Sequence, residues 1–285
     1  MCLIVFAYQY HPEYNLILAA NRDEFYARPT RPMQFWKPQD NTRAAQHQGQ
    51  NEFYTSRLTS PIQHCQQPNN ILAGQDLEQG GTWLGMQQNG RFSAVTNHRD
   101  GRNRSNGKRS RGFLSTSFLS SEQPARLYAE QLESDLYDGF NLLIGDNSGL
   151  YYLSNRSQGN HKISHGIHGL SNALLNTPWP KLDARKEMLQ RHLDQETPDV
   201  EHLINLMADN TIYPEHLLPN TGISPEWEQA LSSSFIKLEN YGTRATTVIL
   251  QKHNGETEVV EQNYDVSGAG DRYRYQLELP PIGGS

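Results

Sequence analysis

The first 25 residues switch between apolar runs and a polar break in a pattern that predicts a β-hairpin. Residues 2–8 and 15–21 are mostly apolar, and the polar segment His11-Pro12-Glu13 separates them. Two short apolar runs on either side of a turn signal are typical of paired antiparallel strands. In this pair, facing residues have numbers that sum to about 23 or 24. We therefore expect Cys2 to lie opposite Asn21 or Arg22.

The same pattern recurs three times further along the chain. Each time, two β-prone runs flank a short break, and two of the breaks contain Asn-Gly, a strong two-residue turn signal. The predicted strand pairs are residues 82–86 with 91–97, 140–145 with 150–153, and 246–250 with 258–261, and a last strand is predicted at 273–279.

Helical spacing of apolar residues predicts two short helices between residues 112 and 133 and three later ones, at 180–194, 199–209 and 224–233. Strand pairs interspersed with helices, without a regular strand-helix alternation, indicate an α+β protein whose sheets are largely antiparallel. We find no linker within residues 1–285 and expect one domain. Residues 38–70 are rich in Gln, Asn, Ser and Thr, so we interpret them as a surface loop or insertion and Cys65 as a bystander thiol.

Composition narrows the class of protein. The 285 residues carry a net charge of −6, which argues against general nucleic-acid binding, because such binding draws its affinity from phosphate neutralisation. Residues 99–111 are locally basic, and we weigh a solvated loop against a lid that contacts an anionic ligand. Two cysteines without regular spacing predict neither a disulfide framework nor a metal site and favour the cytoplasm. No apolar run approaches the ~20 residues of a membrane span.

Cys2 is the first candidate for chemistry, since it directly follows Met1. Removal of Met1 would give one residue both a thiol nucleophile and a free α-amine to act as its base. The hairpin brings Arg22 and Asp23 to the same strand end, where Arg22 would favour the thiolate and Asp23 would accept from the amine or hold Arg22. An exposed ion pair at the end of a strand is the alternative for Asp23.

Further candidates lie at other predicted strand ends. Asn97 and Asn172 are possible oxyanion donors or plain turn residues, and Arg244 is a possible partner of Asp23 or of a ligand carboxylate. His98 and His168 are possible ligands of a metal or haem iron, with loop hydrogen bonding as the alternative. Trp83 suits the core or a pocket wall.

Several segments in order resemble the NRDE family, also called the transport and Golgi organisation protein 2 family. Shorter matches lie at 73–74, 96–97, 139–142 and 169–172. The longest are Met-Cys-Leu-Ile-Val-Phe-Ala at 1–7, Asn-Arg-Asp-Glu-Phe-Tyr-Ala-Arg-Pro at 21–29, Gly-Gly-Thr-Trp-Leu-Gly at 80–85 and Thr-Pro-Trp-Pro-Lys at 177–181.

This family looks like a branch of the N-terminal nucleophile hydrolases, which implies a four-layer αββα sandwich of two antiparallel sheets between helices. The resemblance also implies a role for each candidate. Cys2 would be nucleophile and base, Asp23 its orienter, Asn97 and Asn172 oxyanion or amine contacts, and Arg22 and Arg244 the electrostatic frame.

The resemblance implies two functions. NRDE proteins are associated with moving haem and with lipid or acyl-coenzyme A handling, so one expectation is an intracellular carrier of haem or a similar amphipathic anion, with an acceptor protein and with haem as cargo rather than a required cofactor. Its ligand site would comprise Arg22, Trp83, His98, His168 and Arg244. The alternative is an N-terminal-cysteine hydrolase that acts on amides or on acyl thioesters such as acyl-coenzyme A.

Overall fold

The computed structural model describes residues 2–38, 70–102 and 108–284. Most of the predicted 38–70 insertion, together with Cys65, lies outside the described residues. The single-domain interpretation stays a prediction. In the described part of the chain, no helix is long and apolar enough to cross a membrane.

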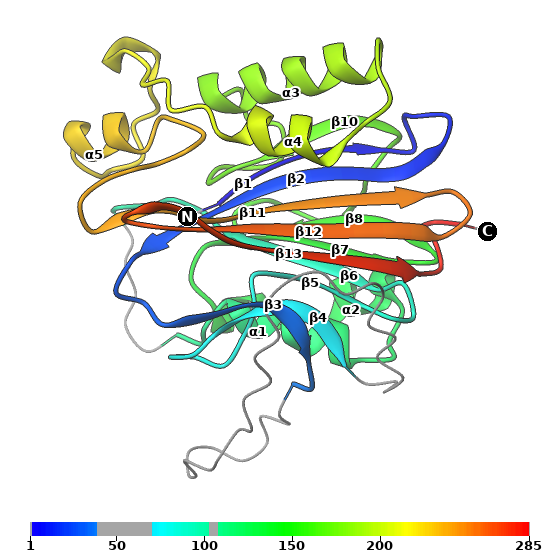
Figure 1. The fold of residues 1–285 in the computed structure, drawn as a ribbon. Coiled ribbons are helices and arrows are strands. Elements are labelled where there is room, and N and C mark those ends of the chain that lie inside the picture. Colours follow the sequence, from blue (N-terminus) through cyan, green and yellow to red (C-terminus); the bar gives the residue numbers. More distant parts are fainter. Residues whose placement is uncertain (1, 39–69, 103–107, 285) are drawn as a thin grey trace.

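Two antiparallel sheets form the centre of the molecule (Figure 1). The six-stranded sheet has the strand order β10-β1-β2-β11-β12-β13, and the seven-stranded sheet runs from β3 to β9 in sequence order. The first comprises β1 (Cys2–Tyr8), β2 (Tyr14–Phe25), β10 (Gly166–Leu170), β11 (Tyr241–Lys252), β12 (Glu256–Asp265) and β13 (Gly268–Glu278). The second comprises β3 (Thr30–Trp36), β4 (Ile71–Asp76), β5 (Leu84–Gln87), β6 (Phe92–Asn97), β7 (Phe140–Asp146), β8 (Gly149–Ser154) and β9 (His161–Lys162).

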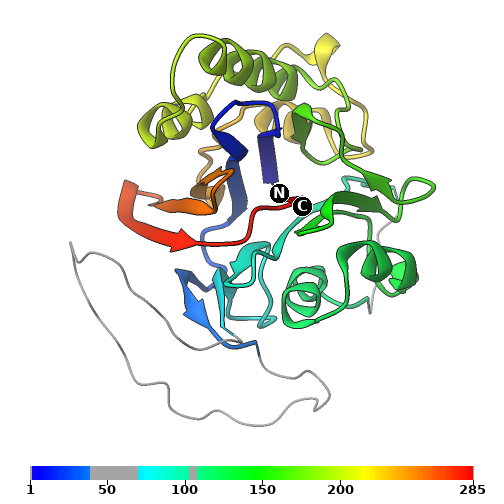
Figure 2. The same cartoon turned by 90° about the vertical axis from the view of Figure 1, so that its right-hand side faces the viewer.

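Helices cover the outer faces of both sheets. Figure 2 shows one helix pair above the strands and the other below them. α3 (Pro180–Leu193) and α4 (Val200–Met207) pack on the six-stranded sheet, whereas α1 (Gly112–Ser120) and α2 (Ala125–Gln131) pack on the seven-stranded one. α5 (Pro225–Ala230) lies between α4 and β11 in the sequence. The structure thus confirms the α+β class and the antiparallel sheets.

Residue parity along β1 explains this layering. Ile4 and Phe6 belong to the apolar cluster that lies between the sheets, whereas Leu3 and Val5 belong to the cluster under α3 and α4. Successive side chains of a strand point to opposite faces, so a continuous apolar run is buried on both sides. The run at 2–8 therefore forms a central strand rather than an edge strand.

Several boundaries differ from the sequence prediction. β11 and β13 extend beyond the predicted runs, and α5 ends at Ala230 rather than near 233. The pattern also missed β3, β4, β9 and β10. β10 is short, and its partner strand β1 lies far earlier in the chain, so only long-range packing specifies β10.

Candidate active site

Cys2 lies directly opposite Arg22 in the β1–β2 pair, as the hairpin arithmetic predicted. Facing residues of an antiparallel pair point to the same side of the sheet. Both line a cavity of about 720 Å³ at the end of the strands. A volume of this size is within the range of small-molecule sites. Cys2 itself is buried, with 8% of its surface exposed.

The Cys2 thiol is protonated at neutral pH in the chain that retains Met1. The pKa of this thiol is raised to about 11, mainly by burial; the nearby charge of Asp23 contributes to this rise, and the charge of Arg22 acts against it. Because the thiolate is the nucleophilic form, the buried cysteine needs a base to become reactive.

Asp23 is a buried carboxylate held by β11. The hydroxyl of Thr243 donates to its Oδ1 over 2.7 Å, and the hydroxyl of Tyr241 donates to its backbone carbonyl over 3.1 Å. Burial raises the pKa of Asp23 above its ordinary value, and the charge of Lys181 together with the Thr243 hydrogen bond lowers it. These contacts fix the position of the carboxylate, and the residue forms part of the cavity wall.

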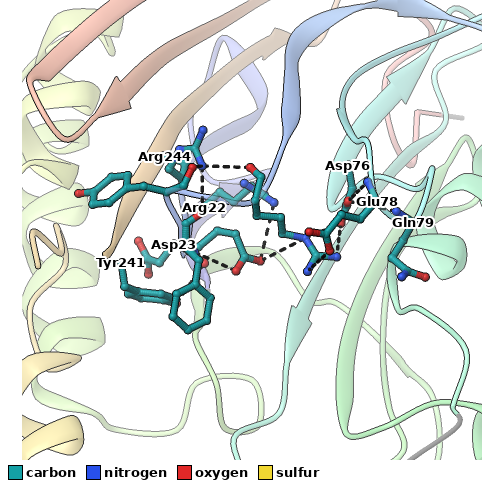
Figure 3. Close-up of polar contacts among 11 residues, drawn as sticks. Arg22, Asp23, Asp76, Glu78, Gln79, Tyr241 and Arg244 are labelled. Atoms are coloured by element: carbon teal, nitrogen blue, oxygen red, sulfur yellow. Dashed lines mark hydrogen bonds and ion pairs between the residues drawn. The ribbon is translucent and has the colours of Figure 1, made fainter. Parts of the chain in front are cut away.

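A series of charged side chains beside Asp23 lines the rim of the cavity (Figure 3). Glu24 lies 3.8 Å from both Arg22 and Arg28. Arg28 is anchored more tightly by Asp76, at 2.7 Å, and by Glu78, at 3.1 Å. The rim therefore presents an ordered row of alternating charges that joins the two sheets.

Arg244 reaches the cavity from a β-bulge. The pairing of β11 with β2 shifts register between Thr243 and Ala245, so Arg244 is the extra residue. Its Nη1 donates to the backbone carbonyls of Phe25, Tyr26 and Arg28 at 3.0 to 3.3 Å. Arg244 thus lines the cavity, and its guanidinium holds the chain that leaves β2 rather than the carboxylate of Asp23. Its predicted role as part of an electrostatic frame stays a prediction.

The two asparagines occupy different places. Asn97 ends β6 and lines the cavity. Asn172 is buried behind it, where its side-chain amide donates to the backbone carbonyl of Asn97 over 2.9 Å. Asn97 is thus placed to contact a ligand, whereas Asn172 positions Asn97.

The three remaining residues of the predicted ligand site lie in three different places. Trp83 lines the cavity that contains Cys2, and His98 lines a second cavity. His168 lines neither: its Nε2 is 2.9 Å from the carbonyl of Ser164, and its Nδ1 is 3.1 Å from the amide nitrogen of Asn176. The structure places His168 in β10 as a hydrogen-bonded, buried residue away from the other candidates.

The second cavity adjoins the first and is more apolar. It has a volume of about 620 Å³, and the aromatic rings of Phe25, Tyr241 and Trp227 on its wall meet edge to face at 5.1 and 6.1 Å. Phe25 and Trp227 are 52% and 42% exposed. The two cavities share Glu24, Asn97, Arg111 and Asp138.

Sequence reasoning missed Lys181. Its side chain is buried at the start of α3, where Nζ donates to the carbonyls of Leu231, at 2.7 Å, and Ser233, at 3.2 Å. Burial lowers the pKa of Lys181 to about 8, against the effect of the charge of Asp23. A buried lysine is rare without such partners. Lys181 is the last residue of the family motif at 177–181, but no feature of that motif shows that its side chain points into the protein.

The second missed residue is Arg111, which we treated only as part of the basic 99–111 segment. Its Nη1 donates to the carbonyl of Gly139 over 3.1 Å, and the side chain lines both cavities. Burial lowers the pKa of Arg111, and the charges of Asp138 and Cys2 raise it. Lys108 and Arg109 also line the first cavity, whereas residues 103–107 lie outside the described residues. The described end of the segment thus contributes cations to the site.

Comparisons with known proteins agree with this arrangement of motifs. The family model described as Transport and Golgi organisation 2 matches residues 1–52 and 48–266. A Transport and Golgi organization protein 2 homolog of Bos taurus is 33% identical over 288 residues, covering 92% of this chain and 93% of that protein. The Homo sapiens homolog is 32% identical over 286 residues, with the same coverage. The Drosophila melanogaster protein of this name is 25% identical over 290 residues. A match over nearly the whole chain shows that the chain belongs to the Transport and Golgi organisation 2 family.

Proposed function

We propose that this protein is a cysteine hydrolase that acts on an amide or an acyl thioester, with Cys2 as an N-terminal nucleophile once Met1 is removed. The observation that supports this proposal is the position of Cys2, which lies opposite Arg22 in a cavity that Asp23 and Asn97 also line. Two antiparallel sheets with helices on their outer faces are consistent with the N-terminal nucleophile hydrolase fold, although fold alone does not establish chemistry.

Removal of Met1 supplies the missing base. A free α-amine on Cys2 has a reference pKa of roughly 7.7 to 8.0, so part of it is unprotonated near neutral pH and can accept the thiol proton. The thiolate then adds to the substrate carbonyl carbon, and the ammonium returns its proton to the departing amine or thiol. Water, deprotonated by the same amine, hydrolyses the resulting thioester on Cys2 and releases the acid.

The surrounding residues have separate tasks in this scheme. Arg22 lies across from the sulfur and stabilises the thiolate, and the side-chain amide of Asn97 donates to the oxyanion. Asp23, held by Thr243, orients the new ammonium group. Asn172 acts one layer further out, because its amide fixes the backbone of Asn97.

The polarity of the two cavities orients the substrate. The first is lined by acidic and basic side chains in equal number, and the second has the aromatic wall of Phe25, Tyr241 and Trp227. A substrate with its polar part in the first cavity and its apolar part in the second places the reacting carbonyl near Asn97, which both cavities share.

The test begins with the intact mass of protein purified from a host that removes Met1. Incubation of this protein with a short-chain acyl-coenzyme A and with an N-acyl amino acid should add one acyl mass to the peptide that begins at Cys2, and Cys2→Ser should abolish the thioester adduct and turnover. Cys65→Ser is the matched thiol control and should retain both. Processed protein without adduct or turnover on either substrate class would contradict the proposal.

Carriage of haem or a similar amphipathic anion is the second candidate function. This candidate is supported by Trp83 on the wall of a large cavity that Arg22 and Arg244 also line. A cytoplasmic location stays a prediction for both functions. Haem titrated into the protein should saturate at one equivalent by Soret absorbance, with equal affinity in Cys2→Ser. A titration without saturation would remove this candidate. We place hydrolysis first because the charged lining suits a polar substrate better than the apolar body of haem.

A further inference from the structure

A cluster of three side chains lies where α3 meets α4, outside both cavities. His192 is in the last turn of α3, Asp199 is the N-cap residue of α4, and His202 is in the first turn of α4. One nitrogen of each histidine and one carboxylate oxygen all lie within 4.8 Å of one another. Two helix ends therefore bring two imidazoles and a carboxylate to one point.

Asp199 is held in place by the helix that it caps. One oxygen, Oδ1, accepts from the backbone N–H of His202 over 2.8 Å. The other oxygen, Oδ2, faces Nε2 of His192 at 3.9 Å, which is too long for a hydrogen bond. The cap thus fixes the carboxylate and leaves Oδ2 directed at the histidines.

His192 is the second, independent indication of a ligand. Its side chain is 2% exposed, and its Nε2 has no hydrogen-bond partner among the residues that the structure describes. A buried polar nitrogen without a partner is costly, so such a group needs an explanation. Its other nitrogen, Nδ1, lies 3.7 Å from Glu196. At this distance Glu196 makes no hydrogen bond to His192.

We propose that His192, Asp199 and His202 bind a divalent transition-metal ion of the zinc class, with water in the remaining position. Two imidazole nitrogens and one carboxylate oxygen suit zinc and its neighbours better than calcium or magnesium, which prefer oxygen ligands. The imidazole rings stack with their centroids 3.6 Å apart. Because the two ring planes are nearly parallel, at 5°, binding requires the less buried ring, His202, to tilt until its lone pair converges with that of His192.

The site would fasten α3 to α4, the two helices that cover the six-stranded sheet. The ligands come from residues 192 and 202, which are separated by the connection between the helices, so no short sequence motif announces the site. We predicted no metal from the sequence for this reason. The inference is independent of the hydrolase proposal, because none of the three residues lines either cavity.

The test is calorimetric titration of Zn²⁺ into metal-free full-length protein, with Co²⁺ absorbance as a spectroscopic readout. We expect one equivalent to bind, and Asp199→Asn and His202→Ala each to weaken binding at least tenfold. Asn remains a good N-cap, so Asp199→Asn should keep the helix intact. Zinc should raise the unfolding temperature of the wild type and not of these variants.

Two controls keep the result interpretable. His216→Ala removes an exposed histidine elsewhere and should bind zinc like the wild type. The double variant Cys2→Ser, Cys65→Ser should also bind normally, because the proposed ligands include no thiol. Absence of binding by the wild type, equal binding by Asp199→Asn and His202→Ala, or loss of binding with the thiols would each overturn the proposal.

Discussion

The guanidinium of Arg99 lies 2.6 Å from the carboxylate of Glu228, and the two side chains are only 7% and 6% exposed. Glu228 also accepts hydrogen bonds from the backbone N–H and the hydroxyl of Thr221. Arg99 lies over the ring of Trp179 at 4.8 Å. This buried pair joins the segment after β6 to α5 behind the candidate site.

Breaking the Arg99–Glu228 pair should destabilise the fold strongly. Arg99→Met leaves the buried carboxylate of Glu228 without its cation, so we expect a loss of about 3–5 kcal/mol in the free energy of unfolding, measured by urea denaturation. Adding Glu228→Gln should recover at least about 1 kcal/mol, since the uncompensated charge is gone. The exposed Arg126–Glu130 pair is the control, and Arg126→Met should change stability far less than Arg99→Met, because water screens a surface pair. Equal effects at both sites would contradict this account.

Asn21 should be essential for stability rather than for chemistry. Its fully buried amide donates to the carbonyls of Met207, at 2.9 Å, and Ser234, at 2.8 Å, and its Oδ1 accepts from the hydroxyl of Thr246. Asn21→Ala leaves these groups unsatisfied, so we expect a loss of about 3–5 kcal/mol in urea denaturation. Asn205→Ala, at an exposed position of α4, should cost under about 1 kcal/mol. If Asn21→Ala had the same free energy of unfolding as the wild type, this role would be refuted.

Lys181 should make stability depend on alkaline pH. Its pKa is lowered to about 8 in the folded state, whereas an unfolded lysine titrates near about 10.4. Between these values the unfolded chain binds more protons, so the free energy of unfolding rises with pH, by roughly 3 kcal/mol across the window. The raised pKa of Cys2 lowers stability over an overlapping window, so the Lys181 contribution is read as the difference between the curves of the wild type and of Lys181→Met in chemical denaturation at pH 7.5 to 10.5.

Lys186 offers the matched comparison for this experiment. It lies on the same helix but is less buried than Lys181. Lys186→Met should therefore follow the wild-type curve. If Lys181→Met also follows the wild-type curve, burial of the ammonium group does not affect folding as we infer.

Cys2 should react slowly with alkylating agents while Met1 is present. Its pKa of about 11 keeps the thiolate fraction small, so at pH 8 alkylation by iodoacetamide should be roughly a hundredfold slower than for an ordinary thiol and should rise tenfold per pH unit. The Cys65→Ser background reports Cys2 alone. Asp23→Asn should speed the reaction, because the charge of Asp23 raises the pKa of Cys2.

Asp271→Asn is the control for that comparison, since Asp271 also lines the cavity but is exposed. Its alkylation rate should match that of the Cys65→Ser parent. An alkylation rate that levels off near pH 9 would show that the thiol has an ordinary pKa and that burial does not protect it.

Local pattern was enough to place Cys2 beside Arg22. The turn around residue 12 is short, so it limits the register to a narrow choice, and the observed pair of Cys2 with Arg22 is one of the two pairings predicted. The later hairpins and helices were also predicted for this reason, because each depends on neighbours in the sequence. The motif at 21–24 was recognised from the sequence, but the sequence does not show that Asn21 supports the fold while Arg22 lines the cavity.

Tertiary structure alone decided which charged residues surround the thiol. Lys181 and Arg111 come from distant segments, and a lysine or arginine in a polar stretch normally lies in solvent. The burial of Lys181 and the place of Arg111 on the cavity wall therefore became visible only when α3 and the 108–112 segment packed against the sheets. The bulge at Arg244 likewise depends on the pairing of β11 with β2, more than 200 residues apart. Strand and helix formation is a local preference, whereas the convergence of side chains on one cavity is set by long-range contacts that no short window of sequence contains.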